Sequence, residues 1–329
     1  MKRRFVIGRG AVAIAGAMAA ALAAWPAAAQ TYPNKPVHVI FPYPAGSDLD
    51  AVGRLIADRA AQQLGQPLVF ENRPGANGIL GTGVAARSAP DGYTILLTTT
   101  SAFLLNSFTR KDLPYDPLKS FTPILPVANI PVALMVRSNL PVNTTAEFVR
   151  YLKANPGKVN YGSVGNGSFN HLLAEQFKMA AGVDMTHVPY QGASLIANEM
   201  IAGRIDATVL GIGSVMGQWK AGQVKVLSFM STQRSLTQPD IPAISEDLPG
   251  FRPFSNWIGF VAPAGTPAPI VDRLAKAFQV VLAQPEVKQR IVEQQWSVMG
   301  GSPADFRATI EGDMPVIEAA FKSTGITPE

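Results

Sequence analysis

The chain has 329 residues, of which 47% are hydrophobic and 16% charged, and it contains no cysteine. This apolar content excludes a disordered chain, and the lack of cysteine excludes disulfides, thiolate metal sites and thiol nucleophiles. The formal charge of +5 comes mostly from four basic residues before position 10, because the chain after residue 29 carries 24 basic and 23 acidic side chains. That balance excludes a general basic surface, so we expect no nucleic-acid partner.

The first 29 residues have the pattern of a secretory signal peptide. Basic residues including Arg3 and Arg4 come first, an apolar run follows over residues 11–24, and three alanines end at Ala29. We therefore expect cleavage before Gln30 and a location in the periplasm. The alternative, a membrane anchor, is disfavoured because the apolar run is shorter than the roughly 20 residues that cross a bilayer. The adjacent arginines leave both the general and the twin-arginine secretion routes open.

After this segment, short β-rich runs alternate with segments in which apolar residues recur at helical spacing. The predicted elements in chain order are a strand at 38–41, a helix at 50–64, a strand at 68–70, a helix at 81–86, a strand at 94–97, a helix ending at 152, a strand at 159–161, a helix at 170–181, a strand at 185–188, a helix at 194–201, and strands at 207–210, 226–229 and 257–261. In the proline-rich passage 113–131 the local pattern predicts no element. Repeated strand–helix units predict an α/β fold with parallel sheets covered by helices, and ligands at the carboxyl ends of the strands.

Three helix starts carry recognisable capping signals. Thr144 and Glu147 match a capping box at the start of the helix that ends at residue 152. Thr266 and Ser302 each precede a proline, a pairing of N-cap and first helical residue that opens the last two long helices.

The sequence shows no motif of a known catalytic or metal centre. It lacks a nucleophile elbow, a phosphate-binding Walker loop, a zinc-protease helix and a calcium-binding loop. His38, His171 and His187 fall in three separate predicted elements without metal-ligand spacing. We therefore expect no metal, no cofactor and no enzymatic activity. A periplasmic hydrolase or isomerase that uses His171 or His187 stays open, because catalytic groups assemble in space.

Four loops that follow predicted strands have a common composition of glycine and hydroxyl residues. They are residues 42–50, 98–101, 163–169 and 189–194. Glycine permits close approach of the backbone, and free N–H groups at a helix start favour an anion. None of these loops contains Lys or Arg, so we expect neutral donors to hold a bound carboxylate. Ordinary turn and N-cap chemistry is the alternative explanation.

Many short segments along the chain match one family in order. They are Tyr-Pro-Asn-Lys-Pro at 32–36, the loop 42–50, Glu-Asn-Arg-Pro-Gly-Ala at 71–76, Ala-Pro-Asp-Gly-Tyr-Thr at 89–94, Leu-Pro-Tyr-Asp-Pro at 113–117, Gly-Asn-Gly at 165–167 with His-Leu at 171–172, His-Val-Pro-Tyr at 187–190, and Ala-Pro-Ala-Gly-Thr-Pro at 262–267. In these segments the chain resembles the periplasmic substrate-binding receptors of tripartite tricarboxylate transporters, the Bug or TctC type. The resemblance covers essentially all of the chain after the predicted signal peptide.

The resemblance implies a type II periplasmic binding fold with two lobes and two crossover strands, near residues 127–136 and 255–262. The first lobe would combine residues 31–131 with 256–329, and the second would hold residues 132–255. Closure of the lobes would trap a small carboxylate, which the membrane components of the transporter would receive. We expect a monomer that binds its ligand without covalent chemistry.

The loops and the resemblance together single out fourteen candidate binding residues. Hydroxyl donors are expected from Ser47, Thr99, Ser101, Ser163 and Ser168, backbone donors from Gly46, Asn166, Gly167 and Gly192, and pocket walls from Tyr43, Phe169, Tyr190 and Trp257, while Asp50 matches an aspartate of the family. For Asp50, the N-cap of the first helix is the alternative role.

Departures from the family pattern suggest which carboxylate is bound. Ser47 and Asp48 replace glycines, residues 210–211 are Leu-Gly where many relatives have Asp-Asn, and aromatic side chains stand at Phe169 and Trp257. These changes favour a flat, apolar ligand without an amino group, and an aromatic dicarboxylate such as terephthalate is the specific hypothesis. A ligand sensor for a histidine kinase ectodomain is the alternative function, because it would use the same closure.

Overall fold

The computed structural model describes residues 32–235 and 237–325. The predicted signal peptide and its cleavage site lie outside these residues. From Lys35 onward the chain forms the unit described below. None of its described helices combines the length and the apolar character needed to cross a membrane.

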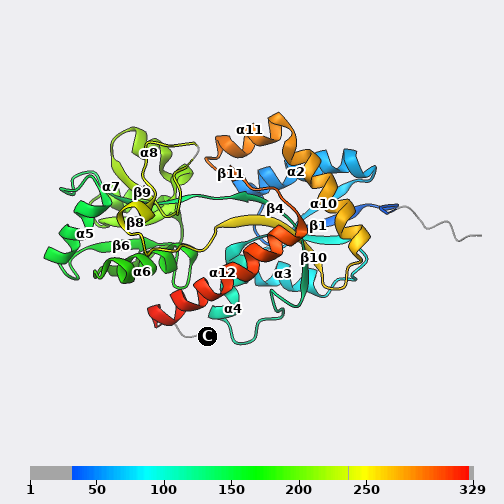
Figure 1. The fold of residues 1–329 in the computed structure, drawn as a ribbon, viewed down its shortest axis with the longest axis horizontal. Helices are drawn as coiled ribbons and strands as arrows, with labels where there is room; N and C mark the ends of the chain where they lie inside the picture. Colours follow the sequence, from blue (N-terminus) through cyan, green and yellow to red (C-terminus); the bar gives the residue numbers. More distant parts are fainter. Residues whose placement is uncertain (1–31, 236, 326–329) are drawn as a thin grey trace, which may run out of the picture. The chain divides into compact units, whose positions relative to one another are not determined.

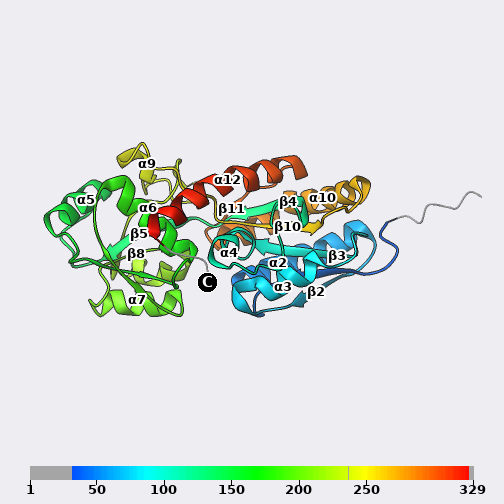
Figure 2. The same ribbon diagram turned by 90° about the horizontal axis from the view of Figure 1, so that it is seen from below.

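A six-stranded sheet forms the centre of the first lobe (Figures 1 and 2). Its strands lie in the order β11 (Ser297–Val298), β4 (Phe121–Asn129), β10 (Trp257–Pro263), β3 (Thr94–Thr99), β1 (Val37–Phe41) and β2 (Leu68–Asn72). The helices of this lobe are α2 (Asp48–Leu64), α3 (Ile79–Ala86), α4 (Asn106–Thr109), α10 (Ala268–Ala283) and α11 (Pro285–Glu293). Strand β1 pairs in parallel with β2 and β3, as the repeated strand–helix units predict.

A five-stranded sheet forms the centre of the second lobe. Its strands lie in the order β7 (Thr186–Pro189), β6 (Asn160–Ser163), β8 (Ala207–Gly211), β5 (Val132–Arg137) and β9 (Val224–Phe229). The helices of this lobe are α5 (Thr145–Ala154), α6 (Phe169–Ala181), α7 (Ala193–Ile201), α8 (Met216–Lys220) and α9 (Ile244–Asp247). The predicted α/β fold with two lobes is confirmed.

Both sheets are mixed rather than purely parallel. Strand β10 is antiparallel to β3 and β4, and β5 is antiparallel to β8 and β9. The reason is connectivity, because β5 and β10 are the strands that enter each sheet from the other lobe. The chain crosses at residues 130–131 and returns through the segment that precedes β10.

A third connection between the lobes comes from the C-terminal helix α12 (Pro303–Thr324). It packs against β4 of the first lobe and against α6 of the second (Figure 1). Its N-cap is Ser302, whose hydroxyl accepts the N–H of Asp305, and Pro303 occupies the first turn as predicted.

Strand β4 lies in the proline-rich passage for which no element is predicted. Its Pro126 stands opposite Gly259 and its Pro123 opposite Val261, and the pairing with β10 shifts register just before each of these positions. Proline lacks the N–H that a regular ladder requires, so it is tolerated in strands mainly at such irregularities. The prolines that hid this strand in the sequence therefore stand at its bulges.

Candidate functional site

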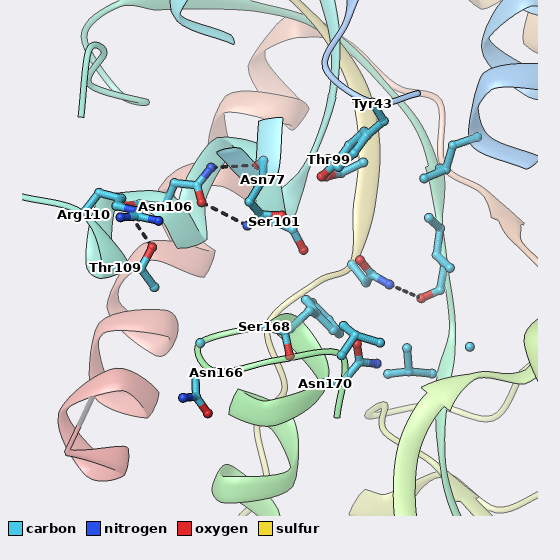
Figure 3. A pocket seen from close by; sticks show the side chains of 18 residues that line it. Tyr43, Asn77, Thr99, Ser101, Asn106, Thr109, Arg110, Asn166, Ser168 and Asn170 are labelled. Atoms are coloured by element: carbon cyan, nitrogen blue, oxygen red, sulfur yellow. Dashed lines mark hydrogen bonds between the residues drawn. The ribbon is translucent and has the colours of Figure 1, made fainter. Parts of the chain in front are cut away.

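A cavity of about 640 Å³ lies between the two lobes, at the carboxyl ends of β1, β3, β6 and β8 (Figure 3). The first lobe contributes Tyr43, Leu49, Asn77, Thr99, Ser101, Asn106, Thr109 and Arg110, the second contributes Val132, Val164, Asn166, Gly167, Ser168, Phe169, Asn170 and Gly211, and the crossing segments contribute Ile130 and Asn256. This is the edge at which α/β sheets bind ligands.

The N-terminus of α6 opens into this cavity. Ser168 caps the helix, because its hydroxyl accepts the N–H of His171 at 3.3 Å. The N–H groups of Phe169 and Asn170 come before any acceptor within the helix, and the first turn contains no acidic residue. Such a helix start favours a bound anion through its free donors and its dipole.

The N-terminus of α2 is already neutralised by its own acids. Ser47 is the N-cap, and its hydroxyl accepts the N–H of Asp50 at 3.1 Å. The Asp50 carboxylate accepts from Gly46 N at 3.0 Å, Asn72 Nδ2 at 2.8 Å and Arg54 Nε at 3.1 Å. Burial alone would raise the pKa of Asp50, but these hydrogen bonds outweigh it and hold the pKa below its usual value. Asp50 is therefore not the N-cap, and its carboxylate already accepts the Gly46 N–H.

Hydroxyl groups of the first lobe face the start of α6. The Tyr43 hydroxyl and Thr99 Oγ1 lie 2.8 Å apart, and Thr99 Oγ1 also accepts the N–H of Ala102 at 3.3 Å. Burial raises the pKa of Tyr43, so this pair stays neutral. Within the described part of the chain, the Ser101 hydroxyl makes no hydrogen bond and is available to a ligand.

Two asparagines fix the wall beside Ser101. Asn77 adopts a left-handed backbone with φ of 52°, and its Nδ2 donates to Asn106 Oδ1 at 3.0 Å. Asn106 Nδ2 donates in return to Asn77 O at 3.1 Å and to Ala102 O at 3.1 Å. The buried Asn106 therefore holds the loop of Asn77 against the turn that follows β3.

Arg110 is the one charged residue among the eighteen that line the cavity, and its side chain is exposed. The expectation of purely neutral donors stays a prediction. It rested on the four glycine- and hydroxyl-containing loops, whereas Arg110 follows α4, eleven residues after the end of β3.

The crossing segments at the back of the cavity are tied to each other. Asn256 Nδ2 donates to Ile130 O at 3.1 Å, and Ile130 N donates to Asn256 O at 2.8 Å. Thr100 Oγ1 donates to Ser255 O at 2.8 Å and accepts the N–H of Trp257 at 3.0 Å. These bonds anchor the second crossing to the end of β3.

Asp313 of α12 also holds the second crossing. Its carboxylate accepts from Ser255 N at 3.0 Å, Ser255 Oγ at 3.2 Å and Trp257 Nε1 at 3.2 Å. Burial raises the pKa of Asp313 to about 6, although these three hydrogen bonds act to lower it.

Comparison with known proteins identifies the family. A family model described as "Tripartite tricarboxylate transporter family receptor" (TctC) matches residues 52–319. The chain belongs to this family. TctC receptors are periplasmic, bind small carboxylates without transforming them, and work with tripartite tricarboxylate transporters.

Three solved structures resemble this TctC receptor along most of its length. Periplasmic binding protein BugD is 32% identical, with a TM-score of 0.73, and the match covers 91% of this chain and 100% of that one. The R. palustris protein Rpa4515, solved with adipate, is 30% identical, with a TM-score of 0.77 and coverages of 91% and 100%. MatC from Rhodopseudomonas palustris, with bound malate, is 29% identical, with a TM-score of 0.72 and coverages of 88% and 100%.

Half of the residues singled out from the sequence line the cavity of this receptor. These seven are Tyr43, Thr99, Ser101, Asn166, Gly167, Ser168 and Phe169. The Gly167 N–H donates to His171 Nδ1 at 3.1 Å, so it is not available to a ligand. Ser47 lies in a second pocket of about 540 Å³ that shares five lining residues with the first: Leu49, Ile130, Val164, Asn170 and Gly211.

The other six expected residues, Gly46, Asp50, Ser163, Tyr190, Gly192 and Trp257, do not line the cavity. Ser163 is completely buried, and its hydroxyl bonds Gly165 and lies 2.6 Å from His187 Nε2. Trp257 is also completely buried, and its ring packs edge-on against Phe103 and Phe306. Both side chains therefore support the walls without reaching the ligand space.

The histidines named for a possible enzyme lie behind the wall rather than in it. His171 and His187 stack with ring centroids 3.9 Å apart. Burial, with a smaller effect of His187, lowers the pKa of His171 to about 4, and burial also lowers the pKa of His187. The neutral pair holds the loop before α6 in place, because His171 Nδ1 accepts the Gly167 N–H and His187 Nε2 contacts the Ser163 hydroxyl. The Ser163 hydroxyl is buried, so it cannot reach a substrate carbonyl.

Sequence reasoning missed eleven lining residues: Leu49, Asn77, Asn106, Thr109, Arg110, Ile130, Val132, Val164, Asn170, Gly211 and Asn256. Leu49, Val164 and Asn170 lie in or next to loops that were singled out, so the loop argument itself could have included them. The positions of Asn77, Arg110 and Asn256 depend on the turn after β3 and on the crossing, for which no local pattern was found.

Proposed function

We propose that this receptor captures a small dicarboxylate in the cavity between its lobes and delivers it to the membrane components of a tripartite tricarboxylate transporter. The observation that carries the proposal is the uncompensated N-terminus of α6, with Ser168, facing hydroxyl groups of the other lobe. The relatives solved with adipate and with malate support a carboxylate ligand.

One carboxylate of the ligand binds at the start of α6. Its oxygens accept from the Ser168 hydroxyl and from the N–H groups of Phe169 and Asn170. Ser101 donates from the first lobe, so the carboxylate joins the two lobes. Each such hydrogen bond to a charged acceptor stabilises the complex by roughly 1.5–3 kcal/mol.

The bound ligand holds the lobes closed. We propose that residues 31–131 with 256–329 move as one body and residues 132–255 as the other, with the crossings at 130–131 and 255–256 as hinges. The hydrogen bonds between Ile130 and Asn256 keep the two crossings together during this motion.

The lining favours dicarboxylates over amino acids. Among the described residues that line it, none is an acid that could pair with an ammonium group, and Gly211 adds no side chain there. An aromatic dicarboxylate such as terephthalate is the finer proposal. Phe169 and Tyr43 supply its aromatic walls, whereas the buried Trp257 gives it no support.

The experiment is a thermal-shift screen of the chain starting at Gln30, followed by calorimetric titration of each hit. The acids are succinate, malate, adipate, citrate, glutamate, benzoate and terephthalate. An acid at 100 times its Kd adds about 2.7 kcal/mol to the free energy of unfolding, which raises the melting temperature visibly. A shift with terephthalate supports the aromatic proposal, and a shift with adipate or malate alone removes that proposal but keeps the receptor. If no acid shifts the transition, the carboxylate assignment is wrong.

A further inference from the structure

Five asparagines line the cavity, and three of them use the side-chain amide nitrogen to bind the protein itself. The three bonds run from Asn170 Nδ2 to Val209 O at 2.7 Å, from Asn256 Nδ2 to Ile130 O at 3.1 Å, and from Asn77 Nδ2 to Asn106 Oδ1 at 3.0 Å. These bonds fix which end of each amide is left for a ligand.

The orientation of each amide follows from its partner. A backbone carbonyl oxygen accepts hydrogen bonds and cannot donate, so the atom that Asn170 or Asn256 turns toward it is the nitrogen. Asn106 Nδ2 donates to backbone carbonyls, so its Oδ1 is the atom that faces Asn77. Within residues 32–235 and 237–325, the Oδ1 atoms of Asn77, Asn170 and Asn256 accept no hydrogen bond. Three acceptors are therefore left for the contents of the cavity.

The three amide oxygens come from different walls of the cavity. Asn77 belongs to the first lobe, Asn170 to the start of α6, and Asn256 to the second crossing. Figure 3 shows Asn77 and Asn170 on opposite sides of the cavity, with Asn170 beside Ser168. Asn77 is exposed and stays open to water, whereas Asn170 and Asn256 are half-buried. A group on the carbon next to a carboxylate at α6 would therefore face Asn170.

A ligand that has only carboxylates cannot satisfy these oxygens. An ionised carboxylate accepts hydrogen bonds and has no hydrogen to donate. Closure over such a ligand would remove the amide oxygens from water without giving them a partner, which is unfavourable. A hydroxyl group on the ligand supplies the missing donor. An ammonium group would also donate, but none of the described lining residues is an acid that could neutralise it.

We propose that Asn170 and Asn256 accept hydrogen bonds from hydroxyl groups on the carbon skeleton of the ligand, so that the receptor selects hydroxylated dicarboxylates over their unsubstituted parents. This inference rests on the proposed function, because it takes one carboxylate to bind at the start of α6. Asn170 binds a hydroxyl beside that carboxylate, and Asn256 binds one farther along the skeleton. Aliphatic and aromatic skeletons can both carry such a hydroxyl.

The test measures Kd by titration calorimetry for pairs of acids that differ only in hydroxyl groups. The pairs are succinate with each enantiomer of malate, and adipate with glucarate, and aspartate is measured beside the first pair. The wild type should bind the hydroxylated acid of a pair about three- to tenfold more tightly than its parent. Leucine has nearly the shape of asparagine without its polar atoms. Asn170→Leu should therefore remove the preference for malate while the Kd of succinate changes by less than about twofold, and Asn256→Leu should reduce the preference for glucarate in the same way.

Asn155→Leu is the matched control. Asn155 Nδ2 also donates to a backbone carbonyl, Tyr151 O at 3.0 Å, and the residue is half-buried but does not line the cavity. This variant should leave the Kd of every acid within about twofold of the wild type. Denaturant unfolding without ligand shows whether each variant folds. If one of the two cavity variants does not fold, the other variant and the wild-type preference within each pair still decide.

The possible failures are distinguishable. If the wild type binds the hydroxylated acids no more tightly than their parents, or if a leucine variant weakens both acids of a pair equally, the role of the asparagine oxygens is wrong and the receptor function stands. Tighter binding of aspartate than of malate would also overturn the inference, because the cavity would then select an ammonium group. If the wild type binds none of these acids, the proposed function fails first and the inference fails with it.

Discussion

Replacing Ser168 with alanine tests where the first carboxylate binds. The Ser168 hydroxyl has two roles in this account, because it caps α6 by accepting the His171 N–H and donates its own hydrogen to the ligand. Alanine removes both. Loss of a hydrogen bond to a charged acceptor costs about 1.5–3 kcal/mol of binding free energy, which is roughly a 10- to 150-fold rise in Kd.

The same substitution lowers stability through the cap. Loss of an N-cap hydroxyl costs about 0.5–2 kcal/mol, and the 3.3 Å length of this bond favours the lower half of that range. Ser168→Gly separates the two roles, because glycine at an N-cap costs only a few tenths of a kcal/mol. We expect both variants to lose the same affinity, while alanine lowers the free energy of unfolding more than glycine does.

The matched control is Thr144→Ala. Thr144 caps α5 by accepting the N–H of Glu147 at 3.1 Å, and it does not line the cavity. It should lose about 1 kcal/mol of stability with no change in Kd. The assays are titration calorimetry with the acid found in the screen and denaturant unfolding without ligand. An unchanged Kd in Ser168→Ala, or an equal loss of affinity in Thr144→Ala, would refute the assignment of the carboxylate to α6.

Three further predictions concern other parts of the chain. At Gly211 a Cβ meets no atom closer than 4.0 Å and φ is −62°, so the fold tolerates a side chain there. Gly211→Asp should bind a dicarboxylate about fivefold more weakly than the uncharged Gly211→Asn, from about 1 kcal/mol of repulsion, and equal Kd values would place the ligand elsewhere. The pKa of Asp313 is raised to about 6, so its stabilising contribution is fully present below about pH 4 and is lost as the pH rises to 6. We therefore expect the difference in unfolding free energy between the wild type and Asp313→Asn to fall by up to about 3 kcal/mol between pH 4 and pH 6.5. Denaturant unfolding measures this difference, and a value that does not change with pH would contradict the prediction. Protein recovered from the periplasm should begin at Gln30 by N-terminal sequencing, and a product that keeps Met1 would favour the membrane-anchor alternative.

Local patterns identified the strands and helices that alternate regularly. The helix of residues 50–64 was expected from its spacing, and the structure begins it only two residues earlier, at Asp48. Strand β4 was missed because Pro123 and Pro126 argue against a strand until the bulges of its partner β10 are known. The bulges depend on the pairing with β10, so the residues of β4 alone do not predict them.

The candidate site was predicted in part for the same reason. Thr99 and Ser168 were found because each lies at the end of a predicted strand or the start of a predicted helix, where topology places ligands. Ser163 also lies at the end of a strand, but its side chain points into the wall of the cavity, where its hydroxyl contacts His187 Nε2. Arg110 was missed because its position depends on the path of the turn and of α4 after β3.

A crystal structure of the receptor with the acid that binds best in the screen would show directly where the carboxylate binds. We expect closed lobes, with one carboxylate within hydrogen-bond distance of the Ser168 hydroxyl and of the first N–H groups of α6. An acid bound outside the cavity, or bound within it with its carboxylate turned away from α6, would contradict the account.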